Sequence, residues 1–247
     1  ELNRQNGSHD LAPMVCEDYA RWVVEDDFAA GRPALERVGV EFVNDVTDYD
    51  NMRYGFDEAA RLMLAYPAYI AGYRKVDHAV HDCRFRTLLR DFLEKDAGAC
   101  ISIPPQVDAE AYRNGLLERF SNAEVCESLA GVCSGGLSRM SVSIVPTLGE
   151  MLKRGMDTSR IAYLMAACRH YLKYRTDDDG RTFSCDEPAM TDSVRPLVES
   201  DDPLDFLRLP VFASLPLVSS ESFRKEFLDS AEAIERYGAM RALEYII

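Results

Sequence analysis

The stretch NMRYGFDEAARLMLAY, Asn51–Tyr66, decides the fold. Its apolar side chains recur every three or four positions and line one face of a helix: Met52, Phe56, Ala59, Met63 and Tyr66. A second face carries Arg53, Asp57 and Arg61, which are four residues apart, so opposite charges are neighbours along a helix. The pattern predicts a helix with one buried face and a solvated ladder of ion pairs, each worth about 0.3–0.5 kcal/mol.

The same helical periodicity continues along most of the chain, with Gly, Pro, Asn or Asp beside each apolar run. It predicts a mainly α, multi-helical domain with a few short strands over residues 14–247, after a flexible lead-in at residues 1–13. We expect a short helix at Met14–Asp26 and a short strand near Val40–Val46. Pro67 should kink or split the long helix that contains the opening stretch.

Turn and cap signals organise the C-terminal third. Asp179-Gly180 lies between short arms that could form strands, which predicts a small surface hairpin. Ser219 or Ser220 should cap a late helix that ends at Gly238. No repeat is found, and no linker-like stretch requires a domain boundary.

Composition excludes several classes of partner. The 247 residues are 47% hydrophobic and carry a formal charge of -14, from 28 basic and 42 acidic residues. This balance argues against binding to nucleic acid or to anionic membrane surfaces. No apolar run is long enough to span a membrane, and residues 1–15 lack the apolar core of a signal peptide. We therefore expect a protein without membrane insertion.

Cysteine usage points to a reducing compartment. The seven cysteines are odd in number, scattered and never in C-x-x-C spacing, which is typical of buried, reduced thiols. The expected location is intracellular: cytoplasmic, or organellar after removal of a targeting segment.

Motifs for cofactors and metals are weak. The sequence contains neither G-x-G-x-x-G nor G-x-x-x-x-G-K-[ST], and no G-x-S-x-G, so we expect no cofactor bound by this chain alone. His78 and His81 could form half of a metal site, but surface or core histidines are the preferred interpretation because no third His or Cys is nearby. The acidic run Thr176–Gly180 lacks the spacing of a calcium loop and is interpreted as a turn.

Several segments, in order and spacing, resemble one family: CEDYARWVVEDDFAAGRPALERVGVEFVNDVTDYDNM, LAYPAYIAGY, LLERFSNAEV, IVPTLGEMLKRG and GAMRALEYI. Over residues 13–247 the chain resembles the C-terminal domain of the polyol-specific long-chain dehydrogenases, the mannitol 2-dehydrogenase family with its fructuronate and tagaturonate reductases. The resemblance implies a helical domain like those of the mannitol and 6-phosphogluconate-type dehydrogenases. In that family this domain supplies the substrate pocket, and a separate Rossmann domain holds NAD(P).

The resemblance also places the catalytic positions. The family pattern K-x-x-x-x-N-G-S-H falls on Arg53, Glu58 and Arg61. An arginine, with a pKa above about 12, cannot serve as the general base that the lysine supplies. A carboxylate at position 58 would repel a developing alkoxide, and position 61 exchanges an imidazole for a permanent cation. NGSH itself occurs at Asn6–His9, with Glu1 where the lysine should be, but its polar surroundings lack the required helix.

A second family segment, D-G-S-x-[KR]-x-P-K, falls on residues 135–142. Only Gly136 and Arg139 match it, which makes Arg139 the candidate substrate-binding residue. The acidic residue and the final lysine are replaced, the latter by Val142.

Two interpretations follow from these replacements. The first is a catalytically degenerate structural or interaction subunit, whose surface toward the Rossmann domain is covered by another chain or by self-association. The alternative is the substrate-binding half of an NAD(P)-dependent polyol or hexuronate oxidoreductase with its cofactor domain elsewhere. Glu58 would then be the only replacement base. A binding role without turnover, such as a sensor of a sugar-derived ligand, is a third interpretation.

Overall fold

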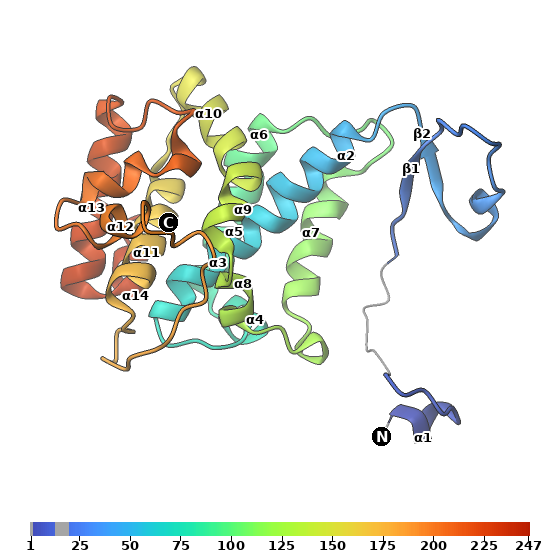
Figure 1. Ribbon diagram of the computed structural model, residues 1–247, viewed down its shortest axis with the longest axis horizontal. Helices are drawn as coiled ribbons and strands as arrows, with labels where there is room; N and C mark the ends of the chain where they lie inside the picture. The colour runs from blue at the N-terminus through green and yellow to red at the C-terminus, as the bar shows by residue number, and fades with distance from the viewer. Residues whose placement is uncertain (1, 13–19) are drawn as a thin grey trace. The chain divides into compact units, whose positions relative to one another are not determined.

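The computed structural model describes residues 2–12 and 20–247 of the chain, which divide into two compact units, Glu1–Val46 and Thr47–Ile247 (Figure 1). None of the helices in these described ranges combines the length and hydrophobicity needed to cross a membrane.

The first unit contains little regular structure: helix α1 (Leu2–Asn6), strand β1 (Val23–Glu25), the 3₁₀ helix η1 (Leu35–Val38) and strand β2 (Glu41–Val43). The two strands are parallel, with Val24 opposite Phe42. β2 confirms the strand predicted near Val40–Val46. Of the helix predicted at Met14–Asp26, residues 14–19 lie outside the described residues. The remainder is irregular chain and β1, so the helix is wrong there, because the β-branched pair Val23-Val24 joins a sheet instead.

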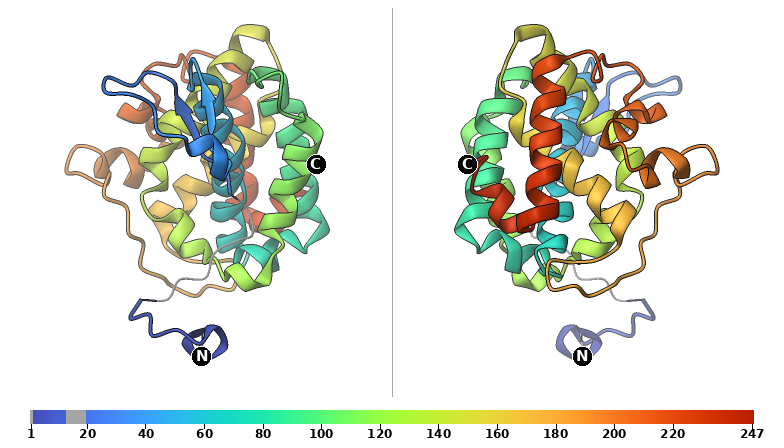
Figure 2. Two further views of the ribbon diagram at one scale, coloured as in Figure 1. Left: turned by 90° about the vertical axis from the view of Figure 1, so that its right-hand side faces the viewer. Right: turned by 90° about the vertical axis from the view of Figure 1, so that its left-hand side faces the viewer.

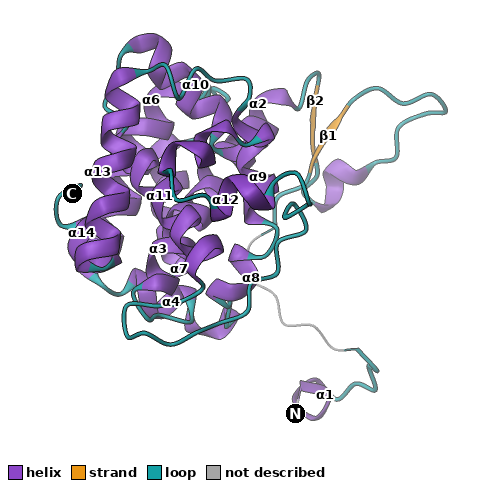
Figure 3. Ribbon diagram, turned by 60° about the vertical axis from the view of Figure 1, so that its left-hand side comes forward, coloured by secondary structure: helices purple, strands orange, loops and turns teal. Residues whose placement is uncertain are grey.

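The second unit is a layered assembly of helices, which confirms the mainly α prediction (Figure 3). Its first half contains α2 (Thr47–Met52), η2 (Arg53–Glu58), α3 (Ala59–Ile70), α4 (Val76–Val80), α5 (Cys83–Asp91), η3 (Phe92–Ala97), α6 (Gly98–Cys100), α7 (Ala109–Phe120) and η4 (Ala123–Val125). Its second half contains α8 (Leu129–Cys133), α9 (Gly136–Ser143), α10 (Val145–Arg154), α11 (Ser159–Tyr174), α12 (Arg195–Glu199), η5 (Pro203–Arg208), η6 (Pro210–Phe212), α13 (Glu221–Tyr237) and α14 (Ala239–Leu243).

The opening stretch forms one continuous helical rod from α2 through η2 into α3. The segment η2 is π-helical, a local widening that is often found at functional sites. In α3 every residue except Arg61 is buried. Pro67 lies inside α3, and the helix continues to Ile70, so the predicted split does not occur. The tight packing of the surrounding side chains maintains the helix despite the missing proline N–H.

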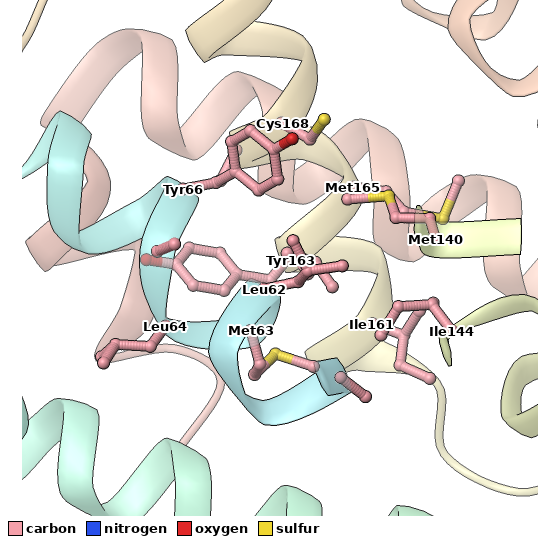
Figure 4. Close-up of a cluster of buried hydrophobic side chains, with 14 of the residues drawn as sticks. Leu62, Met63, Leu64, Tyr66, Met140, Ile144, Ile161, Tyr163, Met165 and Cys168 are labelled. Atoms are coloured by element: carbon pink, nitrogen blue, oxygen red, sulfur yellow. The ribbon is translucent and has the colours of Figure 1, made fainter. Parts of the chain in front are cut away.

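The core is centred on α3 and α11, and α13 packs on the other side of α11 (Figure 2). Side chains of α3, α9 and α11 meet in one cluster, in which Leu62, Tyr66, Met140 and Met165 are fully buried (Figure 4). The hydroxyl of Tyr163 donates a hydrogen bond to the carbonyl of Ala239 over 2.8 Å, so this buried phenol is satisfied. These contacts fix α3 and thereby the helical face that continues into η2.

Two of the local predictions are confirmed. Thr176 and Thr182 form an antiparallel bridge around the turn, with Gly180 at φ +78°, as expected for a small hairpin. Helix α13 follows Ser220 and ends before Gly238, whose φ of +82° favours glycine. Ser220 occupies the N-cap position without a capping hydrogen bond from its side chain.

Helix α5 provides a pH-dependent contribution to stability. Asp82 is the N-cap residue of α5, and it accepts three kinds of hydrogen bond. The Arg84 side chain donates one from Nε over 3.1 Å. The Arg84 backbone N–H and the Tyr73 hydroxyl each donate another over 2.9 Å. These bonds outweigh burial and lower the pKa of Asp82 from 3.8 to about 2. Because the folded value is below the unfolded one, the stabilisation is complete above about pH 4 and is lost as the pH falls toward 2.

We therefore expect Asp82→Asn to lower the free energy of unfolding by about 0.5–1 kcal/mol at pH 7, since water screens the part-exposed Arg84. The difference from the unmodified protein should vanish near pH 2. Urea unfolding at pH 7, 4 and 2.5 measures it, and a difference that stays constant over this range would contradict the assignment.

Candidate functional site

Glu58 and Arg139 meet across two helices. Glu58 ends η2, Arg139 lies on α9, and their side chains form an ion pair although 81 residues separate them. The Arg139 guanidinium also donates to the carbonyls of Val132 and, over 3.0 Å, Ser134. The structure therefore brings two of the predicted site residues together and satisfies the cation with protein groups.

Arg61 belongs to a separate, part-buried charge cluster. Its Nε donates to Asp57 over 2.8 Å, and it also pairs with Glu127. Arg119 of α7 approaches the second oxygen of Asp57 at 3.4 Å. Burial by itself lowers the pKa of Arg61, but the carboxylates of Asp57 and Glu127 outweigh it and raise that pKa above its ordinary value. We call Asp57, Arg61, Arg119 and Glu127 the charge cluster.

The charge cluster corrects the predicted solvated ladder. The side chains of Asp57 and Arg61 are each only 19% exposed, so the ladder is not a freely solvated surface. Asp57 pairs with Arg61 and Arg119 and not with Arg53, because α7 presents a second guanidinium to its other oxygen. Arg53 is exposed, and its guanidinium lies 5.5 Å from the ring centre of Tyr54.

The three positions that the resemblance assigns to catalysis therefore have three different partners. Arg53 lies against an aromatic ring, Glu58 against α9, and Arg61 within the charge cluster. A base and two groups that polarise one alcohol oxygen would have to converge on that oxygen. Two of these side chains instead form ion pairs within the protein, and the third lies against a neighbouring aromatic ring.

A cavity of about 270 Å³ lies beside η2. Asn51 and Gly55 line it from the α2–η2 rod, opposite Val142, Ser143 and Thr147 of α9 and α10. All the side chains that line it are uncharged. Sequence reasoning missed this cavity and the partners Glu127 and Arg119, because nothing local in the sequence shows which distant segments meet.

Gly136 is the first residue of α9, and close packing against α3 requires a glycine there. A Cβ atom at this position would lie 3.0 Å from Leu62 and 3.1 Å from the ring of Tyr66, both fully buried. The neighbouring Leu137 N–H donates to the buried carboxylate of Glu187 over 2.9 Å. An acidic group thus caps α9 from a distant segment, although the acidic residue of the family motif is replaced.

The other candidate motifs, a histidine pair and the NGSH sequence, do not form a metal site or an active site among the described residues. His78 and His81 both lie against Asp77, at 3.6 Å from its carboxylate and 2.7 Å from its carbonyl oxygen, respectively. Over the described ranges, no group of three or more His, Cys, Asp or Glu side chains is arranged to hold a metal ion. Asn6–His9 is exposed at the end of α1.

The helical fold is that of the C-terminal domain of mannitol dehydrogenases. The family model "Mannitol dehydrogenase C-terminal domain" matches residues 45–232, and the chain belongs to this family.

Relatives extend the match over nearly the whole chain. A polyol:NADP oxidoreductase of Gluconobacter oxydans is 32% identical over 243 residues, 98% of this chain and 50% of the relative. A mannitol dehydrogenase of Saccharomyces cerevisiae is 29% identical over 245 residues, 98% of this chain and 48% of the relative. The chain thus spans about half the length of the curated relatives it matches.

Two solved dehydrogenase structures contain the same fold as this chain. A substrate-free D-sorbitol dehydrogenase superposes with a TM-score of 0.89 at 33% identity, covering 98% of this chain and 50% of that one. Pseudomonas fluorescens mannitol 2-dehydrogenase, solved as a ternary complex with NAD and D-mannitol, superposes with a TM-score of 0.90 at 31% identity, covering 99% and 50%.

Proposed function

We propose that this domain is a catalytically degenerate member of its family, retained as a structural or interaction component of a larger assembly. The observation that carries the proposal is the distribution of Arg53, Glu58 and Arg61 among separate partners. Two of them are held in ion pairs, and the third is a guanidinium that cannot accept a proton near neutral pH. A partner chain, a partner domain or a second copy would cover the surface that a cofactor domain occupies in the family.

The test is turnover by the natural protein, assayed with NAD⁺ and NADP⁺ on mannitol and sorbitol and in the reverse direction on fructose and hexuronates. We expect no turnover above background, because the guanidinium at position 53 cannot take the alcohol proton and the carboxylate of Glu58 is held in an ion pair with Arg139. The matched variant Arg53→Lys/Glu58→Asn/Arg61→His restores the family pattern. Its folding, checked by circular dichroism, shows whether the charge cluster tolerates the exchange.

A second candidate is a substrate-binding half of an NAD(P)-dependent oxidoreductase. The cavity beside Asn51 and Gly55 favours it, because an uncharged pocket of about 270 Å³ has the scale of a small ligand. NAD(P) would be held by a separate Rossmann domain, and Glu58 would act as the base. Turnover that disappears in Glu58→Gln, and persists in Glu232→Gln on the exposed face of α13, would establish this candidate and overturn the first.

A further inference from the structure

The chain around Asp186 lies along the loop between α8 and α9. The Gly135 N–H donates to the Asp186 carbonyl over 3.2 Å, and the Ser134 hydroxyl donates to the Asp186 carboxylate over 2.8 Å, although 52 residues separate these two side chains. A cysteine comes directly before each of the joined positions: Cys133 before Ser134, and Cys185 before Asp186. The contacts therefore bring two thiol-bearing segments side by side.

Cys185 faces the helices from this segment. Over residues 183–187 the odd positions are buried or half-buried and the even positions are exposed. This alternation is that of an extended chain, in which side chains two apart share one side. The ring of Phe183 lies 4.7 Å from the ring of Tyr171, and Glu187 accepts a hydrogen bond from the first turn of α9. Cys185 lies between these two contacts and on their side.

The thiol of Cys133 is near this position, at the C-terminal end of α8. It is 1% exposed and interacts with the hydroxyl of Tyr171, the residue against which Phe183 packs. Burial raises the pKa of Cys133, the guanidinium of Arg139 acts against this rise, and Cys185 adds to it. The effect of Cys185 on Cys133 is consistent with neighbouring sulfur atoms. Cys185 itself is only half-buried, so a small oxidant can reach it.

We propose that Cys133 and Cys185 form a reversible disulfide when the protein meets hydrogen peroxide, and that this bond fastens residues 183–187 to the end of α8. Cys185 reacts first, because it is the more exposed of the two. Its sulfur attacks one peroxide oxygen, the O–O bond breaks, and the other oxygen leaves as water, which gives a sulfenic acid. The sulfur of Cys133 then displaces the sulfenic oxygen as a second water and forms the S–S bond. Two thiols and one peroxide thus yield one disulfide and two waters.

The disulfide would act on the loop that holds Arg139. The carbonyls of Val132 and Ser134, on either side of Cys133, accept hydrogen bonds from Arg139, the ion-pair partner of Glu58. In the reduced protein this loop is held by non-covalent contacts, and the disulfide adds a covalent one. Intracellular disulfides are mostly transient and redox-sensing, which matches a bond that cellular thiols can reduce again. The inference concerns oxidation of the protein and is independent of turnover.

Peptide mapping of the natural protein after treatment with hydrogen peroxide provides the first test. The remaining thiols are alkylated in urea, and the protein is digested with trypsin and a glutamate-specific protease without reductant. Cleavage after Glu127 separates Cys126 from Cys133, so the linked peptides identify the partner. We expect Cys133–Cys185 to be the main disulfide and dithiothreitol to remove it. Recovery of both thiols in the alkylated form, oxidation of Cys185 alone, or linkage of either thiol to another cysteine would overturn the proposal.

Limited proteolysis tests whether the bond fastens the segment. Arg181 is 69% exposed in the hairpin, and trypsin cleavage after it requires local opening of the chain that the disulfide ties down. We expect peroxide to slow this cleavage at least about fivefold. Cys185→Ser should abolish the effect, whereas Cys126→Ser, at an exposed cysteine, should keep it. Equal slowing in Cys185→Ser, or unchanged cleavage of the linked protein, would contradict the proposed fastening.

Discussion

Replacing Asp96 by alanine is expected to lower the free energy of unfolding by about 3–5 kcal/mol, because it removes one partner of a buried ion pair. Asp96 lies on the π-helical segment η3 and accepts two hydrogen bonds of 2.6 Å from Arg160 of α11. The two side chains are only 1% and 8% exposed. The guanidinium of Arg160 stays protonated without Asp96, so the variant keeps a buried charge that has lost its bidentate partner.

Urea unfolding of the two proteins measures this loss. Asp229→Ala is the matched control, because Asp229 pairs with Lys225 over 2.6 Å but both side chains are more than half exposed. That exposed pair should contribute far less, because water and salt screen it. Similar losses for the two substitutions would show that the Asp96–Arg160 pair does not anchor η3 to α11.

Gly136→Ala is expected to lower the free energy of unfolding by about 1–3 kcal/mol, because the added methyl group would overpack a densely filled part of the core. The new Cβ would lie 3.0 Å from Leu62 and would overlap the hydroxyl of Tyr66, and both side chains are fully buried. The Tyr66 hydroxyl donates to the Cys133 carbonyl over 3.3 Å, so moving the ring also breaks a buried hydrogen bond.

A double-mutant cycle identifies the cause. In a Tyr66→Phe background the hydroxyl is absent, and the penalty of Gly136→Ala should fall below about 1 kcal/mol. Gly115→Ala is the control on α7, where a new Cβ has nothing within 4 Å and should stabilise the helix by about 0.5–1 kcal/mol. An undiminished penalty in the Tyr66→Phe background would assign the strain to Leu62 instead.

Helical periodicity made most of the fold predictable. The spacing of Met52, Phe56, Met63 and Tyr66 identified the buried face of the central rod, because side chains three and four apart share one side of a helix. Local signals such as Gly180 and Gly238 placed a hairpin and a helix end. Strand β1 could not be predicted in the same way, since its three residues are stabilised by a parallel partner that lies beyond a loop.

The family register nominated the candidate positions, but it did not predict their contacts. The family register identified Glu58 and Arg139, and the fold pairs them. The partners of Asp57 and Arg61 come from α7 and from the loop before α8, 62 and 66 residues away, where no local pattern marks them. The cavity is likewise formed by segments far apart in the chain, so only the packed helices reveal it.

The charge cluster also bears on how this protein could change in the future. A single mutation from Arg61 to histidine would remove the cation shared by Asp57 and Glu127, leaving two part-buried carboxylates with Arg119 as the remaining guanidinium. Such a variant would therefore be less stable unless the acidic residues changed as well. The identity of residue 61 is in this way tied to the acidic residues at positions 57 and 127, so substitutions at the three positions are expected to be coupled.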